Sequence, residues 1–297
     1  MKRTIFSGVA TAVPTPFCFD GGVDHAAFSA LTKRQFAAGV KTLVVASTTG
    51  EGSTLSCGEA LSLLETALTE AADSGGKIIG AVCENDTARA ATLARTISKT
   101  GVGALLAITP FYNKTNDNGL IRHFFAIADA SEKPIILYNV PSRTGMTISP
   151  ALYKKLASHP NIYGVKEASS NFDTFFLARA LTNSDFSFYS GCDETFIPFC
   201  LCGGSGVISV LSNVCPKAVL SCWEGIIRRD IKSLLSWQRA FNALIALLFC
   251  EVNPIPLKFA LSYLGLCNNV LRLPLTPLGA KNEKRLISAL NAVRGYL

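Results

Sequence analysis

The chain has 297 residues, of which 49% are hydrophobic and 16% are charged. This composition excludes a disordered chain and supports a large buried core, and the length fits either two domains or one α/β barrel. The 28 basic and 21 acidic residues give a net charge of +7. Because the basic residues are scattered along the chain, we interpret them as solvated helix faces and expect no nucleic-acid partner.

The sequence also indicates where the protein works. Its longest apolar stretch, residues 241–250, is shorter than the about 20 residues that a membrane helix needs, so we expect a buried helix and no membrane partner. No long apolar run follows Lys2 and Arg3, which predicts the absence of a signal peptide and a cytoplasmic location. The ten cysteines form no Cys-x-x-Cys pair and the three histidines lie far apart, so we expect reduced, mostly buried thiols and no metal site.

Eight short apolar runs predict the strands of a parallel sheet. They are rich in Val, Ile, Leu and Ala and lack a clean polar alternation, which is typical of strands buried on both faces. The runs cover residues 8–13, 42–46, 77–82, 104–108, 134–139, 161–166, 186–190 and 206–210.

Helical patterns with recognisable start signals separate these runs. The signals are Asp24, the Ser56-x-x-Glu59 capping box, Ser149-Pro150 and Cys215-Pro216. Eight strand–helix repeats predict a (β/α)8 TIM barrel over residues 1–230. A C-terminal helical extension over 231–297 follows, with helices at 231–249, 255–266 and 280–296. The alternative is an open doubly wound sheet, whose dinucleotide-binding form is disfavoured because no Gly-x-Gly-x-x-Gly follows the first strand.

Lys166 is the most informative single residue. Barrel enzymes place their active sites at the carboxyl ends of the strands, and Lys166 ends the sixth predicted strand. Burial there disfavours the charged ammonium and favours the neutral amine that attacks a carbonyl group. The alternative is a structural ion pair with Glu167 or another acid.

Hydroxyl groups and an arginine follow other predicted strands. Thr48, Tyr112 and Tyr138 can both donate and accept hydrogen bonds, so together they can relay protons; the alternative for each tyrosine is a core aromatic. Arg143 is either a surface residue or a carboxylate ligand in a loop at the same end of the barrel. The turn at 48–51 offers hydroxyl and N–H groups for a small anion, or is an ordinary strand-to-helix turn.

Seven motifs extend through nearly the whole chain in order. Three contain the residues above: Ser-Thr-Thr-Gly-Glu at 47–51, Tyr-Asn-Val-Pro-Ser-Arg-Thr-Gly at 138–145 and Gly-Val-Lys-Glu-Ala-Ser at 164–169. The others are Thr-Pro-Phe-Tyr-Asn-Lys at 109–114, Gly-Val-Ile-Ser-Val at 206–210, Asn-Pro-Ile-Pro-Leu-Lys at 253–258 and Arg-Leu-Pro-Leu at 272–275. In these motifs the chain resembles the dihydrodipicolinate synthases, which belong to the N-acetylneuraminate lyase superfamily of Schiff-base aldolases.

The resemblance implies a reaction, the condensation of pyruvate with L-aspartate 4-semialdehyde to 4-hydroxy-tetrahydrodipicolinate in diaminopimelate and lysine synthesis. It implies no separate cofactor, because Lys166 forms a covalent imine with pyruvate. Tyr138, Thr48 and Tyr112 would form the proton relay, with Tyr112 reaching into the site of a neighbouring subunit. The implied assembly is a homotetramer built as a dimer of dimers.

The resemblance also implies how the two substrates bind. Arg143 would bind the carboxylate of the semialdehyde, which favours this short acidic substrate over a sugar acid. Thr49 and its neighbouring backbone would hold the carboxylate of pyruvate. Gly191 and Ile208 would contact pyruvate through their backbones.

One region departs from the lysine-inhibited members of the family. Cys57 and Ala60 stand where histidines are frequent, Arg89 where a glutamate can bind the ammonium group of lysine, and Phe111 where a tyrosine is common. Asn85 alone is retained. Because Arg89 would repel an ammonium group, we expect weak or absent inhibition by lysine.

Two other functions stay open on the sequence. The first is another pyruvate-dependent aldolase, acting on a 2-keto-3-deoxy sugar acid or on N-acetylneuraminate, which a substrate panel would separate. The second is a catalytically inactive barrel that binds a small acid, which the joint presence of the lysine, hydroxyl and arginine side chains disfavours. A metal-dependent aldolase is disfavoured by the absence of a histidine cluster.

Overall fold

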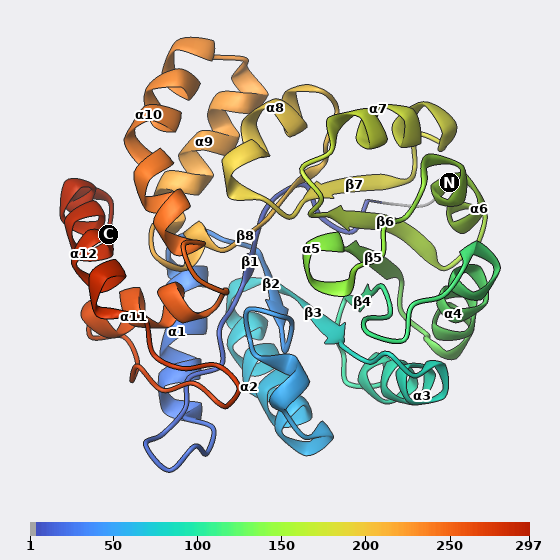
Figure 1. The fold of residues 1–297 in the computed structure, drawn as a ribbon, viewed down its shortest axis with the longest axis horizontal. Coiled ribbons are helices and arrows are strands. Elements are labelled where there is room, and N and C mark those ends of the chain that lie inside the picture. Colours follow the sequence, from blue (N-terminus) through green and yellow to red (C-terminus); the bar gives the residue numbers. More distant parts are fainter. Residues whose placement is uncertain (1–3) are drawn as a thin grey trace. The chain divides into compact units, whose positions relative to one another are not determined.

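The computed structural model describes residues 4–297, and its eight strands form a closed barrel in chain order from β1 to β8 (Figure 1). The predicted TIM barrel is therefore confirmed, and each strand lies within one residue of its predicted ends. The strands are β1 (Gly8–Ala12), β2 (Thr42–Val45), β3 (Lys77–Val82), β4 (Ala104–Ile108), β5 (Ile135–Asn139), β6 (Ile162–Glu167), β7 (Ser187–Ser190) and β8 (Gly206–Ser209). Lys2 and Arg3, which bear on the signal-peptide prediction, lie outside the described residues.

Helices follow the strands, and three helices occupy the C-terminal part, as predicted. The first six helices are α1 (His25–Ala37), α2 (Cys57–Ser74), α3 (Thr87–Ser98), α4 (Asp117–Ala130), α5 (Pro141–Thr144) and α6 (Pro150–Ala157). The other six are α7 (Phe172–Leu181), α8 (Phe196–Leu201), α9 (Pro216–Arg228), α10 (Ile231–Leu248), α11 (Ile255–Tyr263) and α12 (Ala280–Ala292). Short 3-10 helices occur at Gly52–Thr54, Asp193–Thr195, Leu211–Asn213 and Arg294–Tyr296.

The four predicted helix starts are confirmed, three of them by a side-chain hydrogen bond at the cap. Asp24 accepts from the backbone N–H of Ala27, and Ser56 and Glu59 form a complete capping box. Ser149 accepts from the backbone N–H of Leu152 at the start of α6, and α9 begins with Pro216 without a side-chain cap. These caps satisfy N–H groups that have no partner within the helix, so they fix where each helix begins.

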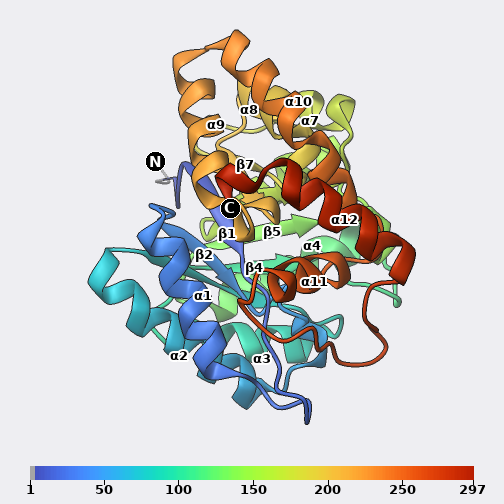
Figure 2. The same cartoon turned by 90° about the vertical axis from the view of Figure 1, so that its left-hand side faces the viewer.

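The chain forms two compact units. The first contains residues 4–8 and 78–208, with β4, β5, β6 and β7 paired in order and α3 packed on α4. The second contains residues 9–77 and 209–297, with β1 paired to β2 and α1 beside α2 (Figure 2). The predicted division at residue 230 between barrel and extension stays a prediction.

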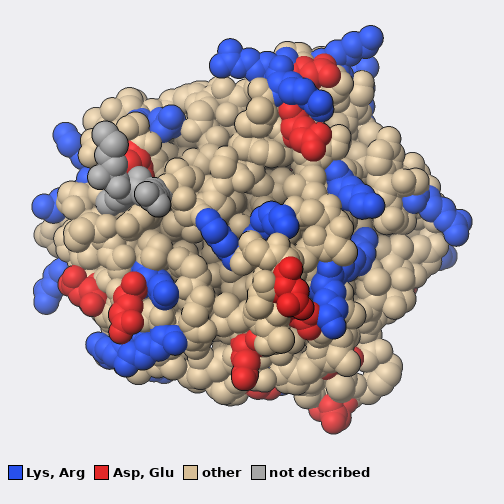
Figure 3. Space-filling view, turned by 180° about the vertical axis from the view of Figure 1, so that it is seen from behind, with Lys and Arg blue, Asp and Glu red and all other residues tan. Residues whose placement is uncertain are grey.

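The structure agrees with the expectations for the longest apolar stretch and for the scattered basic residues. Within residues 4–297, no helix has both the length and the apolar character needed to cross a membrane. Residues 241–250 lie mostly in α10, which buries Phe241, Leu244 and Leu248. On the face shown in Figure 3, basic side chains form small separate groups, several of them beside acidic side chains.

The expectation of mostly buried cysteines is wrong. None of the ten forms a disulfide, but only Cys200, Cys215 and Cys222 are buried. Cys57 and Cys202 are exposed, because they lie at the first residue of α2 and just after α8, where the chain faces solvent. The other five thiols are half-buried.

Candidate active site

Lys166 and Tyr138 lie side by side at the carboxyl ends of β6 and β5. The strand register pairs these two residues directly, and both are buried, with 4% and 6% of their surfaces exposed. The Lys166 Nζ atom lies 4.3 Å from the centroid of the Tyr138 ring. The structure therefore brings the predicted nucleophile next to a predicted proton carrier.

Glu167 does not pair with Lys166, so that alternative is wrong. Its carboxylate accepts hydrogen bonds from Asn139 Nδ2 at 3.0 Å, from the Tyr153 hydroxyl at 2.5 Å and from the Ser169 N–H at 2.9 Å. Burial and the Glu167 carboxylate raise the pKa of Tyr153 well above its usual range, so this hydroxyl stays a donor. Successive residues of a strand point to opposite faces, and this separates the two neighbours.

Lys166 consequently keeps its amine apart from the acids around it. In the part of the chain that the structure describes, none of the salt bridges includes Lys166. Two thiols in its electrostatic surroundings, Cys83 and Cys192, have pKa values raised to about 12, chiefly by burial and against the opposing effect of Lys166. Both thiols are therefore neutral near pH 7 and offer the amine no counter-ion.

Gly191, directly after β7, leaves the space that Lys166 occupies. A Cβ atom at this position would lie 2.7 Å from the Ala168 Cβ and 3.1 Å from the Lys166 Cε. The Gly191 N–H donates to the Glu167 carbonyl at 2.7 Å, which holds the backbone at this short distance. Ile208 is fully buried in β8, one residue beyond the paired Ser190 and Val207.

Arg143 lies on the short helix α5, five residues after Tyr138, and its side chain is exposed. Thr144 fixes this helix, because its hydroxyl accepts from Thr109 Oγ1 at 3.0 Å and contacts the carbonyl of Val140 at 3.3 Å. Gly145 ends the helix with a φ of 65°. The exposed Arg143 side chain therefore extends from a short helix that hydrogen bonds hold in place.

Tyr112 does not join Lys166 and Tyr138 within one chain. It is 93% exposed, and its backbone has a φ of 68°, a strained value for an aromatic residue. The Asn113 N–H donates to the Phe111 carbonyl at 2.8 Å across this residue, so the turn is tight. The structure thus holds the ring away from the core of its own chain.

Thr48 and Thr49 belong to the second unit, in the turn after β2. Thr48 is half-buried, whereas Thr49 is 2% exposed and accepts a hydrogen bond at 3.0 Å from Asn253 Nδ2. Sequence reasoning did not find a role for Asn253. The Asn-Pro-Ile-Pro-Leu-Lys motif at 253–258 contains this residue, but the motif alone does not indicate a contact with Thr49.

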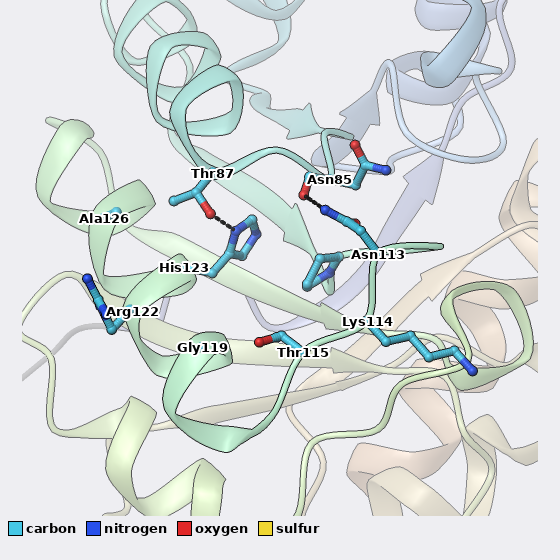
Figure 4. A pocket seen from close by; sticks show the side chains of 10 residues that line it. Asn85, Thr87, Asn113, Lys114, Thr115, Gly119, Arg122, His123 and Ala126 are labelled. Carbon is cyan, nitrogen blue, oxygen red and sulfur yellow. Dashed lines mark hydrogen bonds between the residues drawn. The ribbon is translucent and has the colours of Figure 1, made fainter.

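A cavity of about 560 Å³ lies in the first unit, beside the start of α3 and α4 (Figure 4). It contains His123, whose Nδ1 lies 2.9 Å from Thr87 Oγ1 and whose pKa burial lowers to about 4. Asn85 also lines it and donates to the Phe111 carbonyl at 3.1 Å. Arg89 pairs with Glu84 at 3.3 Å, and weak inhibition by lysine stays a prediction.

Comparison with known proteins gives a consistent result. The chain matches the model of the dihydrodipicolinate synthetase family over residues 5–293. It is 41% identical to the 4-hydroxy-tetrahydrodipicolinate synthase of Exiguobacterium sp. (strain ATCC BAA-1283 / AT1b) over 286 residues, which cover 96% of this chain and 97% of that protein.

Two solved structures are similar over nearly their whole length. The chloride-inhibited dihydrodipicolinate synthase from Acinetobacter baumannii, complexed with pyruvate, has a TM-score of 0.94 and 38% identity, with 99% of this chain and 100% of that chain covered. The enzyme from Cyanidioschyzon merolae, with lysine bound, has a TM-score of 0.94 and 34% identity, with the same coverage. The family match, the identity and the shared barrel agree, and the chain belongs to the dihydrodipicolinate synthetase family.

Proposed function

We propose that this protein is a lyase of the class I aldolase type that condenses pyruvate with L-aspartate 4-semialdehyde to 4-hydroxy-tetrahydrodipicolinate. The observation that carries the proposal is the buried Lys166 amine beside Tyr138, with no salt bridge to it in residues 4–297. An amine without a carboxylate partner is suited to act as a nucleophile. The name of the Exiguobacterium relative supports the same reaction.

The proposed chemistry begins with attack of Lys166 Nζ on the keto carbon of pyruvate. Loss of water gives a protonated imine, which draws electrons from the adjacent methyl group and makes it acidic. Removal of a methyl proton gives an enamine, whose carbon attacks the aldehyde of the second substrate. The amino group of that substrate then attacks the imine carbon, which closes the ring and releases Lys166. No separate cofactor is part of this proposal.

The proton carriers in this proposal are Tyr138, Thr48 and Tyr112. A positioned acid–base group typically contributes about 10²- to 10⁴-fold to a rate. The exposed ring and strained turn of Tyr112 support a role in the site of a neighbouring subunit. We therefore include a homotetramer, built as a dimer of dimers, and a cytoplasmic location in the proposal.

The substrate contacts complete the proposal. Arg143 binds the carboxylate of the semialdehyde, which its exposed position on the anchored helix α5 allows. Thr49 and its neighbouring backbone bind the carboxylate of pyruvate. Gly191 and Ile208 contact pyruvate through their backbones, and the contact of Gly191 with Lys166 supports the first of these.

Replacement of Lys166 tests the proposal. Lys166→Ala should abolish turnover of the two substrates, followed as NADPH loss with the next reductase of the pathway added. It should also abolish the mass increase that borohydride produces with bound pyruvate. Lys154→Ala, on the exposed face of α6, is the control and should behave as wild type.

The possible outcomes separate the candidate functions. Near wild-type turnover by Lys166→Ala would contradict the mechanism. Pyruvate trapping by the wild type without turnover of the semialdehyde would move the substrate to a sugar acid or N-acetylneuraminate. Neither trapping nor turnover would favour a barrel that only binds a small acid.

A further inference from the structure

Two sequence motifs without a role in the proposed reaction meet the turn that carries Thr48 and Thr49. Asn253 of the first motif donates to Thr49 Oγ1, and Lys258 of the same motif lies 2.5 Å from Glu51 Oε1. Arg272, which begins the second motif, donates its backbone N–H to Glu51 Oε2 at 3.0 Å. Three residues of the C-terminal segment therefore hold two residues of the turn.

The contact between Asn253 and Thr49 determines what the threonine hydroxyl can do. Both residues are buried, with 6% and 2% of their surfaces exposed, and the amide nitrogen supplies the hydrogen to Oγ1. The hydroxyl hydrogen of Thr49 is therefore not used toward Asn253 and can be donated to an anionic oxygen. Donation from the amide also polarises the hydroxyl and makes it a stronger donor.

Glu51, two residues after Thr49, forms a fully buried ion pair with Lys258, and both side chains are 0% exposed. Lys258 Nζ also donates to the Val270 carbonyl at 2.7 Å and lies 3.9 Å from the centroid of the Phe17 ring. A buried charge that loses its partner is strongly unfavourable, so the pair keeps the end of the turn in one place.

The backbone of the turn needs such an anchor. Glu51 has a φ of 52°, a left-handed backbone conformation that residues other than glycine rarely adopt. At Gly52 a Cβ atom would lie 1.9 Å from the Ala46 carbonyl oxygen, so the chain turns back tightly on itself. Strained backbone persists where surrounding contacts hold it, and here the contacts come from Lys258 and Arg272.

We propose that Asn253, supported by the Glu51–Lys258 pair, is the positioning residue that directs the Thr49 hydroxyl at the carboxylate of a small 2-oxo acid. This inference rests on the proposed function, because it takes pyruvate on Lys166 as the acid concerned. It predicts a defect in pyruvate binding, and it assigns Asn253 no part in the bond-forming steps.

The test compares Asn253→Ala and Asn253→Asp with the wild type. The pyruvate concentration that gives half-maximal borohydride trapping should rise about tenfold in Asn253→Ala, the effect of losing about 1.4 kcal/mol in binding. It should rise further in Asn253→Asp, whose carboxylate accepts the Thr49 hydrogen and repels the substrate. At saturating pyruvate, kcat and the KM for the semialdehyde should stay within about threefold of wild type.

Two further variants separate positioning from loss of stability. Asn161→Ala removes an asparagine that donates to the backbone carbonyls of Ala128, Ser131 and Lys133, before β6, and it should lower the melting temperature without changing half-maximal trapping. In a Thr49→Val background, Asn253→Ala should add no further rise, because the hydroxyl that it directs is gone. If Asn253→Ala does not fold, Asn253→Ser tests the same contact.

Each outcome decides the inference. Wild-type trapping in the folded Asn253 variants, or a fall in kcat at unchanged half-saturation, would overturn it and leave the Lys166 chemistry intact. A rise equal in Asn161→Ala and Asn253→Ala would reduce Asn253 to a general structural role. Absence of trapping in the wild type would overturn both this inference and the proposed function.

Discussion

At Gly191 the backbone passes so close to Lys166 that one methyl group would fill the gap between them. Gly191→Ala should force Ala168 and the Lys166 side chain away from the new methyl group. In our proposal this lowers kcat/KM, by at most about 10²-fold, because misplacing a reacting group slows the reaction. The coupled assay measures this. Gly58→Ala, in α2 where nothing lies within 4 Å of the added Cβ, should keep wild-type activity. Wild-type kcat/KM in folded Gly191→Ala would show that the lysine does not depend on this space.

The positions of some site residues could be predicted from the sequence, whereas some of their contacts could not. Lys166 and Tyr138 end apolar runs, so their position at the carboxyl ends of strands could be predicted, and the register then made them neighbours. The separation of Lys166 from Glu167 follows from strand alternation, because neighbouring side chains on a strand point to opposite faces. The contact between Asn253 and Thr49 spans 204 residues and leaves no local pattern in the sequence.

At the level of elements, the strands were the most predictable. Burial on both faces makes each strand a continuous apolar run, and every residue of β1, β2, β4 and β5 is buried. Short helices were not predictable in the same way. The helix α5 has only four residues, which is too short to show a helical period. The helix α8 has six residues, which are mostly apolar and include Pro198, so it shows no polar face.

The packing of α3 and α4 includes a histidine that makes stability depend on pH. His123 is 4% exposed, and burial lowers its pKa to about 4, below the value of about 6.5 in an unfolded chain. Between these two values the unfolded state binds the extra proton, so this contribution is present above about pH 6.5 and is lost as the pH falls toward 4. The full difference corresponds to about 3 kcal/mol.

Urea unfolding at pH 7 and pH 4.5 measures this effect. Wild type should lose more free energy of unfolding between the two pH values than His123→Gln, because glutamine does not titrate. His25→Gln, with an exposed side chain at the start of α1, serves as the control and should keep the wild-type difference. Equal losses in wild type and His123→Gln would assign the acid sensitivity to other groups.

For the whole molecule, the exposed Tyr112 makes activity a property of the assembly in our proposal. A chain with Tyr112→Ala and a chain with Lys166→Ala should each be inactive or nearly so, with Tyr112→Ala reduced about 10²- to 10⁴-fold. Subunits exchanged between the two should form hybrids with one intact site and recover activity. Recovery in the coupled assay, with assembly followed by sedimentation, would place Tyr112 in its neighbour's site.

The outcomes of that mixing experiment are distinct. No recovery from hybrids that sedimentation shows to form would place Tyr112 in its own chain's site or outside the reaction. A fully active monomer would contradict both the shared site and the need for a tetramer. Wild type mixed with Lys166→Ala is the control, because exchange leaves its number of intact sites unchanged and its activity should stay constant.

The contact between Asn253 and Thr49 also has a consequence for biosynthesis. The ribosome makes the Thr48–Glu51 turn early, and the first of its partners, Asn253, follows Thr49 by 204 residues. At typical bacterial and eukaryotic translation speeds this is a delay of about 10–40 s, and Lys258 and Arg272 follow later still. During that interval Glu51 has neither Lys258 nor Arg272 beside it, and the turn cannot take its final form. A message cut short before codon 253 would therefore yield chains that lack Asn253, Lys258 and Arg272, the three residues that hold this turn.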